Sequence, residues 1–156
     1  MNFEYFPGEK IVLNGIPIDF GTARANVRKM IGERFTTNDL ELEFEGITIM
    51  HRRDIYHDIN GTTNYFFTGY NANEELESLE LHHCETVVVS GVRFSFNDLF
   101  DEVSNKLSMI DASRVTDHEE TIFSALRLII RSDRQMGGET DVLGYLYCAI
   151  DLISNE

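Results

Sequence analysis

Hydrophobic and polar residues follow the same order in two separate segments of the chain. Residues 9–32 and residues 85–108 each begin with a short β-branched run, followed by a turn, a second apolar run and a stretch of helical periodicity. Aligned without a gap, five of their 24 positions are identical, among them Gly15 and Gly91. Similarity at a fixed offset along a chain indicates a repeated structural unit. We therefore predict two copies of a hairpin followed by a helix.

Local signals place the turns and helices of these segments. Asn14-Gly15 and Ser90-Gly91 each separate two apolar runs, and such residues tolerate the positive φ angles of a two-residue hairpin turn. Apolar residues at helical spacing then predict helices at about 22–31 and beyond residue 97.

Strand-like segments follow each helix and predict sheets. Residues 40–45 alternate strictly between apolar residues and glutamate, which favours a half-buried strand. Further strands are expected at 47–50, 65–68, 76–82, 122–130 and 142–150. The predicted fold class is α+β: two tandem hairpin–helix–antiparallel-sheet units, residues 1–84 and 85–156, packed into one compact body or a single domain.

The charge of the chain narrows the kind of partner. Twenty-seven Asp and Glu residues against 13 Lys and Arg give a net charge of −14, and division before Glu85 leaves each half at −7. Such a field repels nucleic acids and anionic lipids and attracts cationic partners. We expect a basic protein as the partner, and neither a nucleic acid nor a membrane. The alternative is that acidity only keeps the protein in solution.

Cysteine usage and the start of the chain favour a cytoplasmic protein. Cys84 and Cys148 form no CxxC pair, so reduced thiols are expected. The first residues contain no basic region followed by an apolar core, as a signal peptide would. No uninterrupted apolar run approaches the ~20 residues that a membrane-spanning helix requires.

Acidic and aromatic residues in the first half are candidates for binding a partner. Glutamates at 41, 43 and 45 are expected on one face of a strand, although such a row can also serve to prevent edge-to-edge aggregation. The densest aromatic group, residues 65–70, precedes two further glutamates, and exposed aromatics beside carboxylates are typical of binding hot spots. At least two of these aromatic side chains are expected in the core. The predicted partner-binding residues are Glu41, Glu43, Glu45, Tyr65, Phe67, Tyr70, Glu74 and Glu75.

Candidates for chemistry are few. His51, Asp54, His57 and Asp58 offer imidazole and carboxylate ligands of the kind that zinc or iron binds. Their spacing does not place them on one face of a regular helix or strand, and a polar hairpin loop is the favoured interpretation. The chain contains neither a GxSxG motif nor a P-loop. We therefore predict no catalytic residues, no cofactor and no enzymatic activity.

The paired units around Gly15 and Gly91 give the chain a layout that resembles the tandem-repeat β-lactamase inhibitor proteins. That resemblance implies a rigid inhibitor that presents a sheet face to an enzyme. In its length, its acidity and its lack of catalytic motifs the chain also resembles bacterial immunity proteins, which cover the active surface of a toxin, often a basic nuclease.

The functional prediction is a non-enzymatic, acidic binding protein that neutralises a basic protein, such as a toxin-immunity or inhibitor protein. One alternative is a metal-binding protein or metal-dependent enzyme that uses the segment from His51 to His57. Another is a structural subunit of a larger complex.

Overall fold

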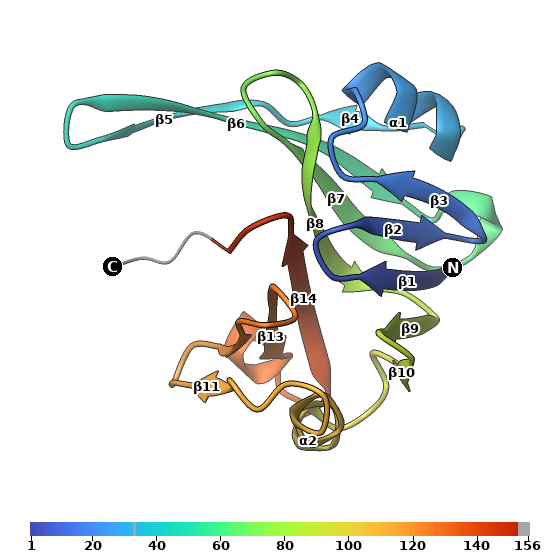
Figure 1. The fold of residues 1–156 in the computed structure, drawn as a ribbon, viewed down its shortest axis with the longest axis vertical. Coiled ribbons are helices and arrows are strands. Elements are labelled where there is room, and N and C mark those ends of the chain that lie inside the picture. The colour runs from blue at the N-terminus through green and yellow to red at the C-terminus, as the bar shows by residue number, and fades with distance from the viewer. Residues whose placement is uncertain (33, 153–156) are drawn as a thin grey trace.

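The computed structural model describes residues 1–32 and 34–152, and strands dominate it (Figure 1). Strands hold 48% of the residues and helices 15%, so the predicted balanced α+β class is wrong and the protein is mostly β. The difference arises because the two α-helices contain only 8 and 9 residues, whereas long antiparallel segments follow each of them. In chain order the elements are β1 (Asn2–Phe6), β2 (Lys10–Leu13), β3 (Ile16–Asp19), α1 (Arg24–Ile31), β4 (Thr36–Thr37), β5 (Leu40–Phe44), β6 (Ile47–His57), the 3-10 turn η1 (Ile59–Gly61), β7 (Tyr65–Tyr70), β8 (Leu76–His83), β9 (Thr86–Val89), β10 (Val92–Phe94), α2 (Phe100–Ser108), β11 (Val115–Thr116), β12 (Thr121–Phe123), β13 (Leu128–Ser132), the 3-10 turn η2 (Arg134–Met136) and β14 (Leu143–Ala149).

The strands form two sheets whose order is nearly symmetric. The larger sheet has the order β11-β12-β13-β14-β8-β7-β6-β4, with β5 paired to β6, and its two central strands, β14 and β8, are antiparallel. The smaller sheet has the order β10-β9-β1-β2-β3, in which β1 is antiparallel to β2 and parallel to β9. In both sheets a strand of the second half therefore runs antiparallel to its counterpart in the first half, β14 to β8 and β9 to β2. A two-fold rotation about an axis normal to the sheet requires this arrangement.

Equivalent hydrogen bonds tie each helix start to its sheet. The backbone N–H of Arg24 donates to the carbonyl of Glu74 at 2.8 Å, and that of Phe100 donates to the carbonyl of Asp141 at 2.9 Å. These bonds make Phe100 the counterpart of Arg24, at the same offset as the sequence repeat. The division of the chain between residues 84 and 85 stays a prediction, and the pairing of β8 with β14 joins the two halves in one sheet.

The predicted hairpins and helices are confirmed, with changes at their ends. Asn14-Gly15 and Ser90-Gly91 both have positive φ at both residues and connect antiparallel strands, as predicted. The predicted strand 122–130 is wrong, because a turn around Arg127, at φ 51°, separates β12 from β13. The sequence analysis also missed β1, which lies at the centre of the smaller sheet.

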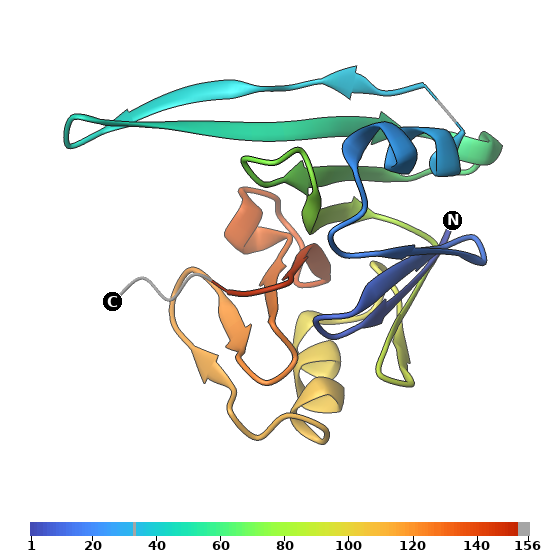
Figure 2. The same ribbon diagram turned by 45° about the horizontal axis from the view of Figure 1, so that its top comes forward.

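The core lies between the two sheets. Phe66 on β7, Leu79 and Leu81 on β8, and Leu146 on β14 point inward from the larger sheet and are fully buried. The smaller sheet contributes Tyr5, and α1 packs against β3 while α2 packs against β10 and β12–β14 (Figure 2). All of this cover lies on one face of the larger sheet, and its other face is left open.

A long hairpin projects from one end of the larger sheet (Figures 1 and 2). We call residues 40–51, which comprise β5 and the start of β6, the arm. The pair Thr37–Asp54 at its base corresponds to the pair Thr116–Thr121 in the second half, where the connecting turn consists of residues 117–120 only. The arm is therefore an extension that one half of the fold has and the other half lacks.

Candidate functional site

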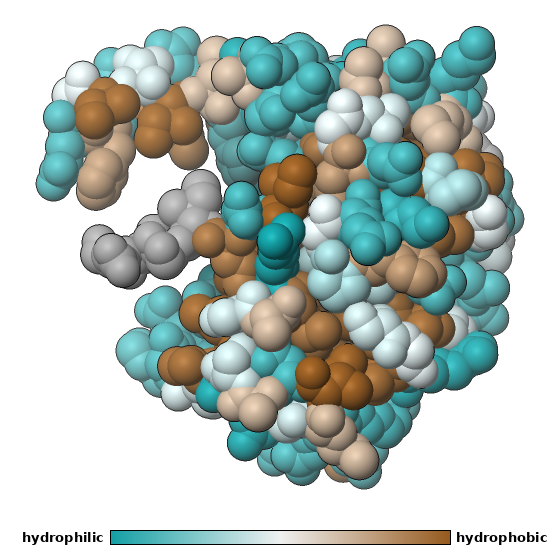
Figure 3. Space-filling view, viewed as in Figure 1, coloured by the Kyte–Doolittle hydropathy of each residue, from teal (hydrophilic) through white to brown (hydrophobic). Residues whose placement is uncertain are grey.

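One side of the arm is apolar and uncovered. Leu42 pairs with Ile49 and Phe44 with Ile47, so their four side chains share one face of the hairpin. Their exposed fractions are 47%, 53%, 67% and 64%, respectively. Figure 3 shows apolar residues on the side of the arm that faces a hollow in the molecule. Contiguous exposed apolar surface of this kind marks an interaction site in soluble proteins.

The apolar face of the arm continues onto the open face of the larger sheet. Along β6 the odd-numbered residues share one face, so Ile47 and Ile49 lead to Arg53 and Ile55. From Ile55 the cross-strand partners on this face follow in register through β7, β8, β14, β13 and β12. We use the name open face for Arg53, Ile55, His57, Tyr65, Phe67, Glu80, His82, Glu120, Ile122, Ile129, Arg131, Tyr145 and Tyr147.

Aromatic rings gather at the centre of the open face around His82. The imidazole of His82 stacks on Tyr65 with a centroid distance of 4.9 Å, lies 4.9 Å from the ring of Phe67 and meets the edge of Tyr145 at 5.3 Å. On the far side of Tyr65, the ring of His57 stacks at 4.2 Å. Rings held against each other in this way form a rigid surface, which loses little conformational entropy when a partner binds.

The charges on the open face are paired with one another. Arg53 lies 3.5 Å from Glu80 and 4.8 Å above the ring of Phe67, and Arg131 lies 2.6 Å from Glu120. Burial raises the pKa of Glu80, but the nearby His82 and Arg53 outweigh this effect and leave the pKa below its usual value. The open face therefore holds balanced charges and aromatic rings within a molecule of net charge −14.

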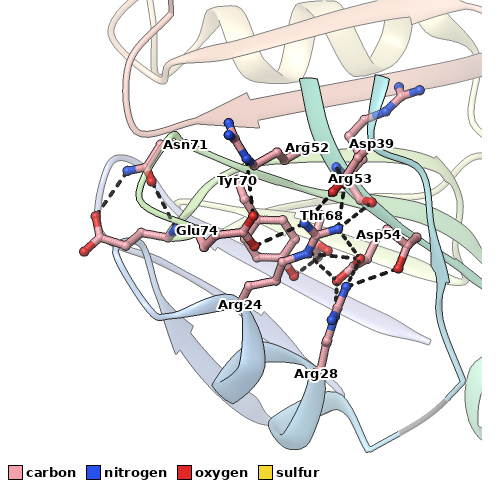
Figure 4. Close-up of polar contacts among 12 residues, drawn as sticks. Arg24, Arg28, Asp39, Arg52, Arg53, Asp54, Thr68, Tyr70, Asn71 and Glu74 are labelled. Carbon is pink, nitrogen blue, oxygen red and sulfur yellow. Dashed lines mark hydrogen bonds and ion pairs between the residues drawn. The ribbon is translucent and has the colours of Figure 1, made fainter. Parts of the chain in front are cut away.

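A buried ion-pair network holds the base of the arm (Figure 4). The guanidinium of Arg24 on α1 donates to Asp54 at 2.6 Å, to Asp39 at 2.9 Å and to Glu74 at 3.2 Å. Arg28 makes two further bonds to Asp54, each of 2.7 Å. Asp39 immediately precedes β5 and Asp54 lies on β6 beyond the arm, so the network fixes the direction in which the arm leaves the body.

The electrostatics of this network keep its groups charged. Asp54 has no exposed surface and Arg24 is 5% exposed. Burial raises the pKa of Asp54, but hydrogen bonds from Arg28 and Arg24 outweigh it, and the pKa lies below its usual value. Burial likewise lowers the pKa of Arg24, and its carboxylate partners reverse this and raise the pKa.

The acidic row predicted on the arm is present only in part. Glu41 and Glu43 lie on β5 and are exposed, on the side opposite the apolar residues. Glu45 does not extend this row, because it occupies the turn with Gly46, at φ 49°. The prediction that strand 40–45 is half-buried is wrong, since both of its faces are exposed.

The other predicted binding residues separate into two environments. Tyr65 and Phe67 lie on the open face, although Phe67 is only 9% exposed. Tyr70 points to the opposite side, where it is 3% exposed and lies under the guanidinium of Arg24 at 4.8 Å. Glu74 pairs with Arg24 and with Arg52, and Glu75 accepts a hydrogen bond from Asn71. Tyr70 therefore lacks the exposed surface of a binding residue, and Glu74 contributes to the ion-pair network.

The residues proposed as metal ligands do not converge. His51 and His57 lie on the same side of β6 as the open face, whereas Asp54 faces the core and binds two arginines. Asp58 follows the strand and accepts a hydrogen bond from the backbone of Asn64. Within residues 1–32 and 34–152, no group of three or more His, Cys, Asp or Glu side chains could hold a metal ion.

A second hollow lies beside α2. It has a volume of about 620 Å³, and Phe100, Ser132 and Gln135 are among its lining residues. Its Arg134 and Asp141 pair with each other at 2.8 Å. It has no ring cluster comparable to that of the open face.

The sequence analysis missed His82, Arg53 and Tyr145 as parts of a surface. Strand register brings them together from β8, β6 and β14. The available signal was the alternation of β8, in which Glu80 and His82 alternate with the buried Leu79 and Leu81.

These features define a class: a mostly-β protein of two sheets, with one open sheet face and a projecting arm. Comparison with protein-family models, curated proteins and solved structures gave no match. Among the helices of the described residues, none has the length and apolar character needed to cross a membrane.

Proposed function

We propose that the protein is a non-enzymatic binding protein that uses the open face and the apolar side of the arm to cover and neutralise a basic protein. The observation that carries this proposal is the continuity of the two surfaces along β6, which joins the exposed apolar side chains of the arm to the partly buried aromatic rings of the open face. A toxin-immunity or inhibitor protein is the kind of protein that acts in this way. Both cysteines of the described chain are unpaired and buried, which agrees with a cytoplasmic location.

Charge and surface composition have separate roles in this proposal. The net charge of −14 attracts a basic partner from a distance and raises the association rate. The rings around His82 supply the contacts that slow dissociation, since tyrosine and arginine are the residues enriched in hot spots. A partner with a basic surface around an apolar centre therefore fits both features.

Two separate variants, Tyr65→Ala and Tyr145→Ala, are each expected to bind the partner about 30-fold more weakly or worse, which is the effect of losing one strong hot spot. The experiment immobilises the full chain and measures which basic protein it retains from a lysate of its source, with affinities then measured by calorimetry. Near-ultraviolet and far-ultraviolet circular dichroism of each variant establish that its fold is intact.

The matched control is Met109→Ala, which removes an 86% exposed apolar side chain after α2, away from the open face. It should leave the affinity unchanged. A basic protein that binds the Tyr65 and Tyr145 variants as tightly as the wild type would show that the open face is not the binding surface.

A further inference from the structure

The outer edge of β5 is a strand edge without a partner strand. Within the described residues β5 pairs with β6 alone, and all five of its residues are exposed. Such an edge presents unpaired backbone N–H and C=O groups that can accept another strand. We propose that the partner docks by adding an extended segment, with alternating basic and apolar residues, to this edge. This inference rests on the proposed function.

The side chains of β5 specify that alternation. Glu41 and Glu43 point to one side of the hairpin, and Leu40, Leu42 and Phe44 point to the other. A strand added beside β5 places its residues directly opposite these, because side chains of neighbouring strands line up in pairs across a sheet. Lysine or arginine opposite the glutamates and apolar residues opposite Leu42 satisfy both faces.

Protection against aggregation does not account for β5. Natural edges are protected by charges, prolines or short strands, and glutamates at 41 and 43 agree with such a role. A strand that only had to avoid pairing would not also expose Leu42 and Phe44 on its other face, where the exposed fractions are 47% and 67%. The two faces together suit a strand that accepts one kind of partner and rejects others.

Charge repulsion disfavours a second copy of the chain as the partner that pairs with the edge of β5. In an antiparallel pairing of two β5 strands centred on Leu42, Glu41 of each copy would face Glu43 of the other. Both contacts would bring like charges together, and each molecule carries a net charge of −14. A basic segment reverses the sign of both effects.

The second half of the fold has no arm, and this makes a direct test possible. In the arm-shortened variant, Asn-Gly replaces residues 41–50, so that Leu40 and His51, which are paired in the structure, flank a two-residue turn. This change keeps Asp39, Asp54 and the whole ion-pair network. The second half of the chain already makes the equivalent connection with residues 117–120.

The experiment measures amide hydrogen exchange in β5 of the full chain by NMR, in the presence of two peptides. One is Lys-Val-Lys-Val-Lys-Val-Lys, and the other has the same composition with its lysines and valines in separate blocks. We expect the alternating peptide to slow exchange of the outward-facing amides of β5 by about tenfold or more, as ordered hydrogen bonds do. The charge-reversed variant Glu41→Lys, Glu43→Lys should lose this protection.

Several results would overturn strand addition: no protection of β5 at millimolar alternating peptide, equal protection by the block peptide, or a dimer of the free protein through β5. The arm-shortened variant separates this inference from the proposed function. If it binds the partner as tightly as the wild type while the Tyr65 and Tyr145 variants do not, strand addition is wrong and the open face remains the binding surface. If none of these variants loses the partner, both proposals fail.

Discussion

Replacement of Asp54 by alanine is expected to lower the free energy of unfolding by about 3–5 kcal/mol, because it leaves buried arginine charge without its main partner. Asp54 accepts hydrogen bonds from both Arg24 and Arg28, and it has no exposed surface. Asp39 and Glu74 remain but are themselves partly exposed. Urea titration followed by circular dichroism gives the free energy directly.

The matched control is Asp141→Ala in the exposed pair with Arg134, which should leave the urea midpoint unchanged because water replaces the lost contact. A second variant uses the symmetry of the fold. The triple variant Arg24→Phe, Arg28→Ser, Asp54→Thr replaces three residues of the network. Each is replaced by the residue at the equivalent position of the second half: Phe100, Ser104 and Thr121. This triple variant should recover most of the loss. A loss as large as that of Asp54→Ala would mean that the two halves are not interchangeable here.

The contribution of Asp54 also has a defined pH dependence. Its pKa in the folded protein lies below its usual value, so its ionised form favours the folded state. The stabilisation is fully present above the ordinary aspartate pKa of about 4 and disappears as the pH falls through the lowered pKa of the folded protein. The difference in stability between the wild type and Asp54→Ala should therefore narrow on acidification below about pH 4.

The second large effect is expected at Tyr5, which connects β1 to the end of β14. Tyr5→Ala should cost about 3–5 kcal/mol, as removal of a large buried aromatic ring does. The ring has no exposed surface and meets the edge of Phe20 at 6.3 Å. Its hydroxyl lies 3.3 Å from the carbonyl of Ala149, to which it donates, and burial raises its pKa.

Tyr5→Phe separates packing from hydrogen bonding at this position. It keeps the ring and removes the hydroxyl, so we expect a loss of only about 0.5–1.5 kcal/mol. The same urea titration measures both variants. If the two substitutions cost the same, the polar contacts of the hydroxyl, and not the packing of its ring, hold β1 against the second half of the chain.

The parts of the fold that the sequence predicted are those that local chemistry determines. Asn14-Gly15 specifies its turn because few other residues accept positive φ at both positions. The strands at 65–68 and 76–82 were predicted because short runs rich in aromatic residues and leucine are separated there by a polar turn. The break at Arg127 was missed, since neither glycine nor proline marks a turn whose φ of 51° the surrounding structure imposes.

The candidate site was harder to predict for two physical reasons. Alternation at residues 40–45 shows that the two faces of a strand differ, but it does not show whether anything covers the apolar face. The open face and the ion-pair network join residues that are distant in sequence, such as His82 with Tyr145 and Arg24 with Asp54. Their proximity depends on strand order, which sequence patterns do not encode locally.

The short turn at residues 117–120 has a consequence for engineering. It occupies the place at which the other half of the chain carries its arm, so the architecture tolerates a long insertion there, and the entropic cost of closing a longer loop rises only slowly with its length. A second hairpin grafted at this turn would give one chain two binding hairpins of different specificity. When both bind one target, the second binding event occurs at a high effective concentration, so the affinity rises without a stronger contact at either hairpin. The shorter half of the fold is thus a ready position for building a bivalent binder.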